Sequence, residues 1–185
     1  ERNVIDLFEK AVAELGPLNG LVNNAGSVGP LCRVADISAA ALDEVLRLNV
    51  TSVFLCCREA VRRLSILSGG AGGSIVNISS RAAVLGGAGE WVHYAASKGA
   101  IDSLTIGLAK EVAAESIRVN AVSPGLIHTG LHAAAGAPER LEKAPGTVPL
   151  GRTGSPEEVA EAVLWLLSPA AAYVTGANIG VSGGR

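Results

Sequence analysis

Tyr94 and Lys98 are the two side chains of this sequence whose types and spacing could do chemistry. On a helix, residues four positions apart lie on the same face, one turn from each other. The positive charge of an ammonium group favours the ionised form of a nearby phenol and lowers its pKa. A free tyrosine has a pKa of ~10, too high for a base at neutral pH. The pair is therefore a candidate general acid/base for an alcohol, although an ordinary exposed helical pair has the same spacing.

The composition of the chain is typical of one folded domain with a substantial core. Its 185 residues are 49% hydrophobic and 17% charged, with a net charge of −2, which argues against disorder and against a nucleic-acid partner. No apolar run reaches the ~18–20 residues that span a bilayer, and no signal peptide is recognisable. The three cysteines have no metal-ligand spacing, so we expect buried thiols, no metal site and a cytoplasmic location.

Helical and strand patterns alternate along the chain, which indicates an α/β fold with a parallel sheet. The apolar spacing predicts a helix that is already under way at residues 4–12, and the chain has no methionine, so we expect the start of the domain to be missing. Further expected elements are helices at 38–63, from about 90 to 112 and from a capping box at 155–158, strands at 20–23, 74–78, 118–122 and 177–181, and an irregular substrate lid at 128–154.

Polar or Gly/Pro-containing loops follow three of these strands. Asn24-Ala25-Gly26 follows the first strand, Ser79-Ser80 the second and Pro124-Gly125 the third. Ligands bind at the carboxyl ends of parallel strands. We therefore expect the three loops to converge on one site together with the helix that carries Tyr94 and Lys98.

The motifs and their order resemble those of the short-chain dehydrogenase/reductases over essentially all 185 residues. The resemblance implies a single domain at 1–185, a Rossmann-like doubly wound parallel sheet with helices on both faces. The family's glycine-rich first turn and its first strands, roughly three, are absent, which implies about 60 further residues. The matching motifs are Asn23-Asn24-Ala25-Gly26, Asn49, Ser79-Ser80, Tyr94-Ala95-Ala96-Ser97-Lys98, Pro124-Gly125-Leu126-Ile127-His128-Thr129 and the ending from Thr175-Gly176 to Gly183-Gly184.

The resemblance implies an NAD(P)-dependent oxidoreductase that interconverts a secondary alcohol and a ketone. Tyr94 would be its general acid/base, and Lys98 would lower the pKa of Tyr94 and hold the nicotinamide ribose. Ser80 would donate a hydrogen bond to the substrate oxygen, and Asn49 would tether Lys98 through a water. Ser80 lies fourteen residues before Tyr94, one more than the commonest family spacing, so Ser79 is the alternative catalytic serine.

The same resemblance assigns the cofactor-binding residues to two loops and the Tyr94 helix. The loop after the first strand would contact the adenosine ribose, and the loop after the third would flank the nicotinamide. The choice between NAD and NADP stays open, because the discriminating residue at the end of the family's second strand is not present. The assigned residues are Asn24, Ala25, Gly26, Tyr94, Lys98, Pro124, Gly125, Ile127 and Thr129.

Several expectations concern the surroundings of the site. We expect a small alcohol or carbonyl compound as substrate, no membrane contact, and a homo-oligomer, a dimer or tetramer, formed through the long helices, with Val53, Leu55 and Ile106 pointing outward. His93 is expected to face away from Tyr94, and Asp102 to be an ordinary surface charge. The alternative function is a catalytically inactive fragment, or a structural or binding remnant of such an enzyme.

Overall fold

The described residues form four strands in one parallel sheet, in the order β1-β2-β3-β4. The computed structural model describes residues 1–139, 141 and 145–185. Each strand is a short apolar run bounded by glycines or polar loop residues. All four strands predicted from the sequence are confirmed. The strands are β1 at Gly20–Asn23, β2 at Gly73–Ile78, β3 at Ile117–Pro124 and β4 at Asn178–Val181.

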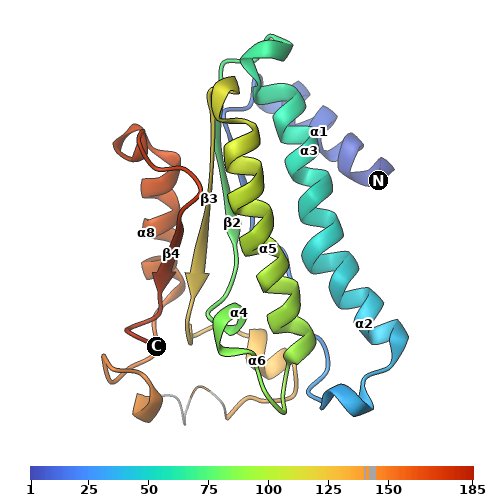
Figure 1. Cartoon of the computed structure of the whole chain (residues 1–185), viewed down its shortest axis with the longest axis vertical. Coiled ribbons are helices and arrows are strands. Elements are labelled where there is room, and N and C mark those ends of the chain that lie inside the picture. The colour runs from blue at the N-terminus through green and yellow to red at the C-terminus, as the bar shows by residue number, and fades with distance from the viewer. Residues whose placement is uncertain (140, 142–144) are drawn as a thin grey trace.

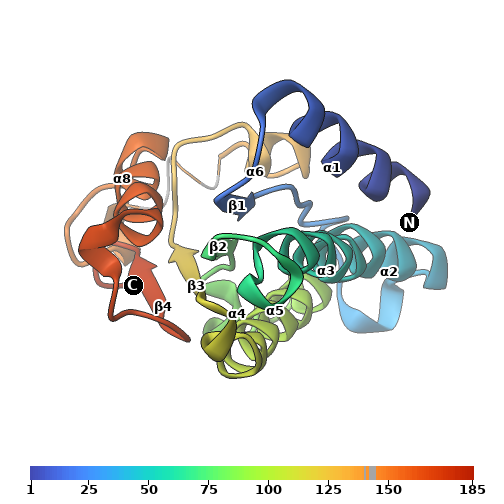
Figure 2. The same ribbon diagram turned by 90° about the horizontal axis from the view of Figure 1, so that it is seen from above.

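Helices cover both faces of the sheet, which confirms the predicted doubly wound arrangement (Figure 1). Seen from above, α1, α3 and α5 lie on one side of the strands and α8 on the other (Figure 2). Successive residues of β2 alternate between the two cores: Ile75 packs in the cluster under α3 and α5, and Val76 in the cluster under α8. The helices are α1 at Arg2–Leu15, α3 at Ser52–Leu64, α5 at Val92–Glu111 and α8 at Pro156–Leu167.

The long helix expected at 38–63 is interrupted by one π-helical turn. It consists of α2 at Ala39–Leu46, the π turn at Arg47–Thr51, and α3. A π turn bulges a helix by one residue and is frequent at functional sites. Asn49 lies in this turn and is fully buried, so the bulge turns a polar side chain toward the interior.

The helix that carries Tyr94 and Lys98 forms as expected, as α5. It follows the short helix α4 at Ala82–Leu85 and the glycine-rich loop after it. The capping box at the start of α8 is also confirmed: the Ser155 hydroxyl accepts from the main-chain N–H of Glu158, and the Glu158 carboxylate accepts from that of Ser155.

The segment at 128–154 is less irregular than expected. It contains a short helix, α6, at Leu131–Ala134 and a 3-10 turn at Pro145–Thr147. Its two ends are fastened together, since the N–H of His128 donates to the carbonyl of Gly154 at 2.8 Å. Residues 140 and 142–144 of this segment lie outside the described residues.

Two expectations about apolar side chains need correction. Val53, expected to point outward, is buried in the core under α3, because the π turn shifts the helix face that follows it. Phe54 is exposed in its place, while Ile106 is exposed as expected. Of the cysteines, Cys57 is buried, but Cys32 and Cys56 are only half-buried. None of the described helices has both the length and the apolar character needed to cross a bilayer.

Candidate active site

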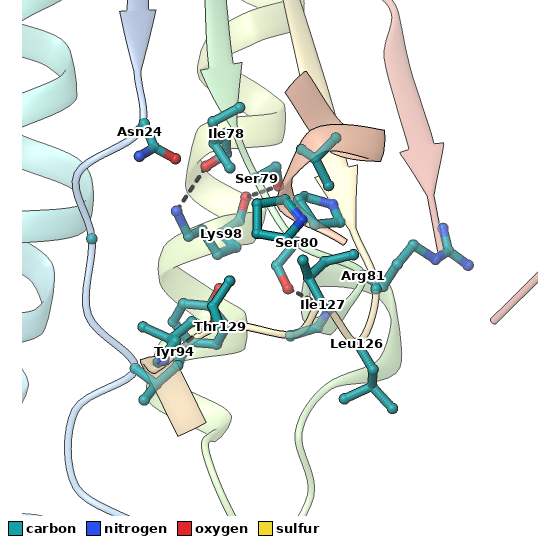
Figure 3. A pocket seen from close by; sticks show the side chains of 18 of the residues that line it. Asn24, Ile78, Ser79, Ser80, Arg81, Tyr94, Lys98, Leu126, Ile127 and Thr129 are labelled. Carbon is teal, nitrogen blue, oxygen red and sulfur yellow. Dashed lines mark hydrogen bonds between the residues drawn. The ribbon is translucent and has the colours of Figure 1, made fainter. Parts of the chain in front are cut away.

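A cavity of about 910 Å³ opens at the carboxyl ends of β1, β2 and β3 (Figure 3). It continues along the sheet face beside α8, where Val22, Ile78 and Val163 line it. The three strand-end loops and α5 converge here as the sequence predicts. Ala25 and Asn49 are the two predicted site residues that do not line it; those that do are Asn24, Gly26, Ser80, Tyr94, Lys98, Pro124, Gly125, Ile127 and Thr129, together with the alternative serine, Ser79.

Tyr94 and Ser80 lie next to each other in this cavity. Tyr94 is in the first turn of α5, and Ser80 follows the end of β2. Burial raises the pKa of Tyr94, and a hydrogen bond with the Ser80 side chain acts in the opposite direction. The lowering of the Tyr94 pKa by Lys98 stays a prediction; in this structure the group that acts to lower it is Ser80. The Lys98 ammonium lies 5.8 Å from the centroid of the Tyr94 ring.

Lys98 is a buried ammonium group, with only 5% of its surface exposed. Its Nζ donates a hydrogen bond of 2.7 Å to the main-chain carbonyl of Ile78. Burial lowers the pKa of Lys98 to about 8, and the carboxylate of Asp102 acts to raise it. Gly26 packs against this group, since a Cβ at that position would lie 3.5 Å from Nζ of Lys98.

Ser79 and Ser80 have different surroundings, although they are neighbours in sequence. Ser79 is buried, its N–H donates to the carbonyl of Val122 at 2.8 Å, and its hydroxyl donates to the carbonyl of Lys98 at 3.3 Å. Ser80 is half-exposed, and its hydroxyl accepts a hydrogen bond of 3.1 Å from the N–H of Ala82. The hydroxyl beside Tyr94 is therefore that of Ser80, while that of Ser79 faces α5.

The Asn49 side chain holds the loop after β1 against Ser97 of α5. Its Nδ2 donates to the carbonyl of Ser27 at 2.8 Å and to the hydroxyl of Ser97 at 2.9 Å, and its Oδ1 accepts from the N–H of Ser27 at 2.9 Å. Ser97 in turn donates to the carbonyl of Tyr94 at 2.7 Å. Both N–H groups of the amide are thereby used. The tether to Lys98 through a water stays a prediction.

Sequence reasoning missed Ser27, Ser97 and Asp102 as neighbours of the site. The available signal for Ser97 was its polar hydroxyl between Tyr94 and Lys98, and in the structure this hydroxyl accepts a hydrogen bond from Asn49 of the π turn. Asp102 is half-buried and accepts a hydrogen bond of 2.8 Å from Nδ2 of Asn178, so it is not an ordinary surface charge.

The imidazole of His93 contacts a loop near the site rather than the cavity itself. His93 is buried, and its Nε2 lies 3.0 Å from the carbonyl of Val28, so the imidazole is engaged with the loop after β1. In the part of the chain that the structure describes, no three His, Cys, Asp or Glu side chains gather closely enough to hold a metal ion.

The fold and sequence have relatives among known proteins. The family model described as "Enoyl-(Acyl carrier protein) reductase" matches residues 1–185. The chain is 51% identical over 185 residues to "Uncharacterized oxidoreductase YgfF" of Escherichia coli (strain K12), covering 100% of this chain and 75% of that protein. It is 39% identical over 180 residues to "3-oxoacyl-[acyl-carrier-protein] reductase FabG" of Thermotoga maritima, covering 97% and 70%.

A solved structure gives the same result for the fold. The crystal structure of a short-chain type dehydrogenase/reductase from Mycobacterium marinum superposes with a TM-score of 0.90 at 34% identity, covering 98% of this chain and 70% of that one. Three comparisons point to the same family: the family model matches the whole chain, the relatives are oxidoreductases by name, and the solved structure superposes closely. The cavity at the strand ends is consistent with them. The chain belongs to the short-chain dehydrogenase/reductase family of oxidoreductases.

Proposed function

We propose that this chain carries the acid/base part of an NAD(P)-dependent oxidoreductase that interconverts a secondary alcohol and a ketone. The observation that carries the proposal is that Ser80, Tyr94 and Lys98 line one cavity, with the Lys98 ammonium 5.8 Å from the centroid of the Tyr94 ring and the Ser80 side chain acting to lower the pKa of Tyr94. Two hydroxyl groups side by side can both hydrogen-bond one carbonyl oxygen. The cofactor, when bound, supplies or accepts the hydride at the neighbouring carbon.

The protein's part in ketone reduction is to deliver a proton. Tyr94 donates its phenolic proton to the carbonyl oxygen as negative charge develops there. Ser80 donates a second hydrogen bond to the same oxygen and stabilises that charge. Because burial raises the pKa of Tyr94, its phenol stays protonated at neutral pH. This favours the reductive direction, and oxidation of the alcohol, which needs the phenolate as base, is favoured at higher pH.

The residues present fit a nicotinamide cofactor. Gly26 leaves space that a side chain would fill, because a Cβ there would lie 3.2 Å from Oδ1 of Asn49 and 3.5 Å from Nζ of Lys98. Lys98 and Tyr94 are the polar groups in position to hold the ribose of the nicotinamide. The loop at Asn24 would bind the adenosine side, and Pro124, Gly125, Ile127 and Thr129, which also line the cavity, would flank the nicotinamide ring.

Substitution of the proposed acid/base tests the function. In the complete natural protein, Tyr94→Phe removes the proton donor and is expected to lower kcat/KM for ketone reduction by about 10²-fold or more. The measurement follows NADH and NADPH oxidation with a panel of ketones, which also identifies the preferred cofactor. Tyr173→Phe is the matched control, since the Tyr173 side chain is fully exposed. Full activity of Tyr94→Phe would contradict the proposal.

We further propose that the chain forms a homo-oligomer through α3 and α5. Phe54 on α3 and Ile106 on α5 are large apolar side chains that are 50% and 47% exposed, and burial of such side chains drives association. A dimer or tetramer in sedimentation equilibrium, weakened by Phe54→Glu, is expected. A strict monomer at micromolar concentration would rule the assembly out.

A cytoplasmic location is also part of the proposal. It is supported by the three cysteines, all of which are free thiols in the structure, as is usual for proteins in a reducing compartment. Fractionation of the source cells, with detection of the protein in the soluble cytoplasmic extract, is the corresponding measurement.

A further inference from the structure

Asp102 lies on α5, one helical turn beyond Lys98. Its carboxylate interacts with Asn178 on β4 and with Ser79 at the end of β2. Asp102 is half-buried, and its Oδ1 accepts a hydrogen bond of 2.8 Å from Nδ2 of Asn178. Asn178 lies 76 positions further along the chain. The carboxylate thus ties the middle of α5 to the far edge of the sheet.

Ser79 is the second partner of this carboxylate. Its side chain is one of the groups that lower the pKa of Asp102, and its hydroxyl donates to the main-chain carbonyl of Lys98 at 3.3 Å. The N–H of Ser79 is bonded to Val122 on β3. Ser79 is therefore held from both sides, and its position determines where the next residue, Ser80, presents its hydroxyl to Tyr94.

Charge gives a third link between Asp102 and the site. The ammonium of Lys98 is buried, and its direct partner is the uncharged carbonyl of Ile78. Of the groups facing Lys98, Tyr94 on α5 is a neutral phenol, and Asn49 of the π turn and Gly26 after β1 carry no charge. The charged group that acts on the pKa of Lys98 is Asp102, and Lys98 acts on Asp102 in return.

We propose that Asp102 is a positioning residue of this active site: its carboxylate balances the charge of Lys98 and, through Ser79, keeps the strand end that carries Ser80 against helix α5. The inference rests on the proposed function, because alignment matters for catalysis only if Ser80, Tyr94 and Lys98 act together. Asp102 touches neither the cavity nor the reacting atoms, so its effect is exerted entirely through these neighbours.

The first test reads Lys98 directly and needs no activity. The protein is labelled with ¹³C at the lysine ε-carbon, and the titration of Lys98 is followed by NMR in the wild type and in Asp102→Asn. Loss of the carboxylate removes a charge that favours the ammonium form, so the Lys98 midpoint is expected to move to lower pH. Glu111→Gln is the matched control, because Glu111 is an exposed carboxylate on the same helix. An identical Lys98 midpoint in wild type and Asp102→Asn would overturn the charge-balancing role.

The second test is kinetic and separates charge from position. For Asp102→Asn in the complete natural protein, kcat for ketone reduction is expected to fall about ten-fold at pH 8 and less at pH 6, with KM little changed. Ser79→Ala keeps the carboxylate, so it is expected to lower kcat by a similar factor at every pH. Asp102→Glu, which restores the charge, is expected to return the pH profile toward that of the wild type.

The outcomes distinguish this inference from the proposed function. If the wild type reduces ketones and Tyr94→Phe does not, but Asp102→Asn keeps the wild-type kcat and pH profile, the positioning role is wrong and the function stands. If the wild type reduces no ketone, the function fails, and the NMR titration still decides whether Asp102 balances Lys98. Equal melting temperatures of wild type and Asp102→Asn ensure that an altered profile does not arise from unfolding.

Discussion

The ammonium group of Lys98 donates a hydrogen bond of 2.7 Å to the main-chain carbonyl of Ile78, the last residue of β2. This contact fastens α5 to the strand end that carries Ser80, as the close view of the cavity shows (Figure 3). It also keeps the charge of Lys98 in the interior, where burial lowers its pKa to about 8. A group placed in this way costs the folded protein stability at neutral pH.

Replacement of Lys98 tests that cost. Between pH 8 and the ordinary lysine value of 10.5, the unfolded chain binds more protons at this site than the folded chain, so stability rises with pH there. Below pH 8 the full cost is present, on the order of 3 kcal/mol. Lys98→Met is expected to lose this rise in the free energy of unfolding, measured with urea from pH 7 to 10. Lys110→Met, at an exposed position of α5, should keep it. Parallel pH curves for Lys98→Met and wild type would contradict the prediction.

Asn49→Ala should destabilise the fold strongly. The substitution leaves the N–H and carbonyl of Ser27 without their partner and removes a donor to Ser97, at a position with no solvent exposure. Each unpaired buried polar group costs about 1–3 kcal/mol, so we expect a loss of at least about 2 kcal/mol in chemical denaturation. Asn3→Ala on the exposed side of α1 should be nearly neutral. A loss below about 0.5 kcal/mol at Asn49 would show that the network is dispensable.

Gly125→Ala should disturb the contact between the loop after β3 and the C-terminal segment. A Cβ at Gly125 would lie 2.8 Å from the Cα of Ser182, where main chain cannot move aside cheaply. Overpacking of this kind costs about 1–3 kcal/mol, which a lower melting temperature would reveal. Gly130→Ala is the control, since a Cβ there would meet no atom within 4 Å. Equal melting temperatures of the two variants would show that the loop yields without cost.

Ser155→Ala should weaken the start of α8. The hydroxyl of Ser155 accepts from the N–H of Glu158, and the Glu158 carboxylate accepts from the N–H of Ser155 at 2.9 Å. Loss of such a cap costs about 1 kcal/mol, to be measured as a shift of the denaturation midpoint. Ser103→Ala, at an exposed position of α5, should not destabilise. If both variants unfold at the wild-type midpoint, the cap contributes nothing measurable.

Local sequence was sufficient for the elements and for part of the site. The capping box at Ser155 and the shared helical face of Tyr94 and Lys98 depend on residues within a few positions of each other. Strand ends could be assigned for the same reason, and parallel topology then brings them to one edge. These features need no knowledge of distant contacts.

Tertiary packing decided how the site residues interact. Asn49 meets Ser97 across 48 positions, and Asp102 meets Asn178 across 76; no pattern within one element encodes such contacts. The same holds for the pKa values of Tyr94 and Lys98, because they follow from how much water the assembled sheet and helices exclude. Spacing therefore identified the candidate acid/base pair, whereas burial in the folded chain determines the direction in which the pKa of each group is shifted.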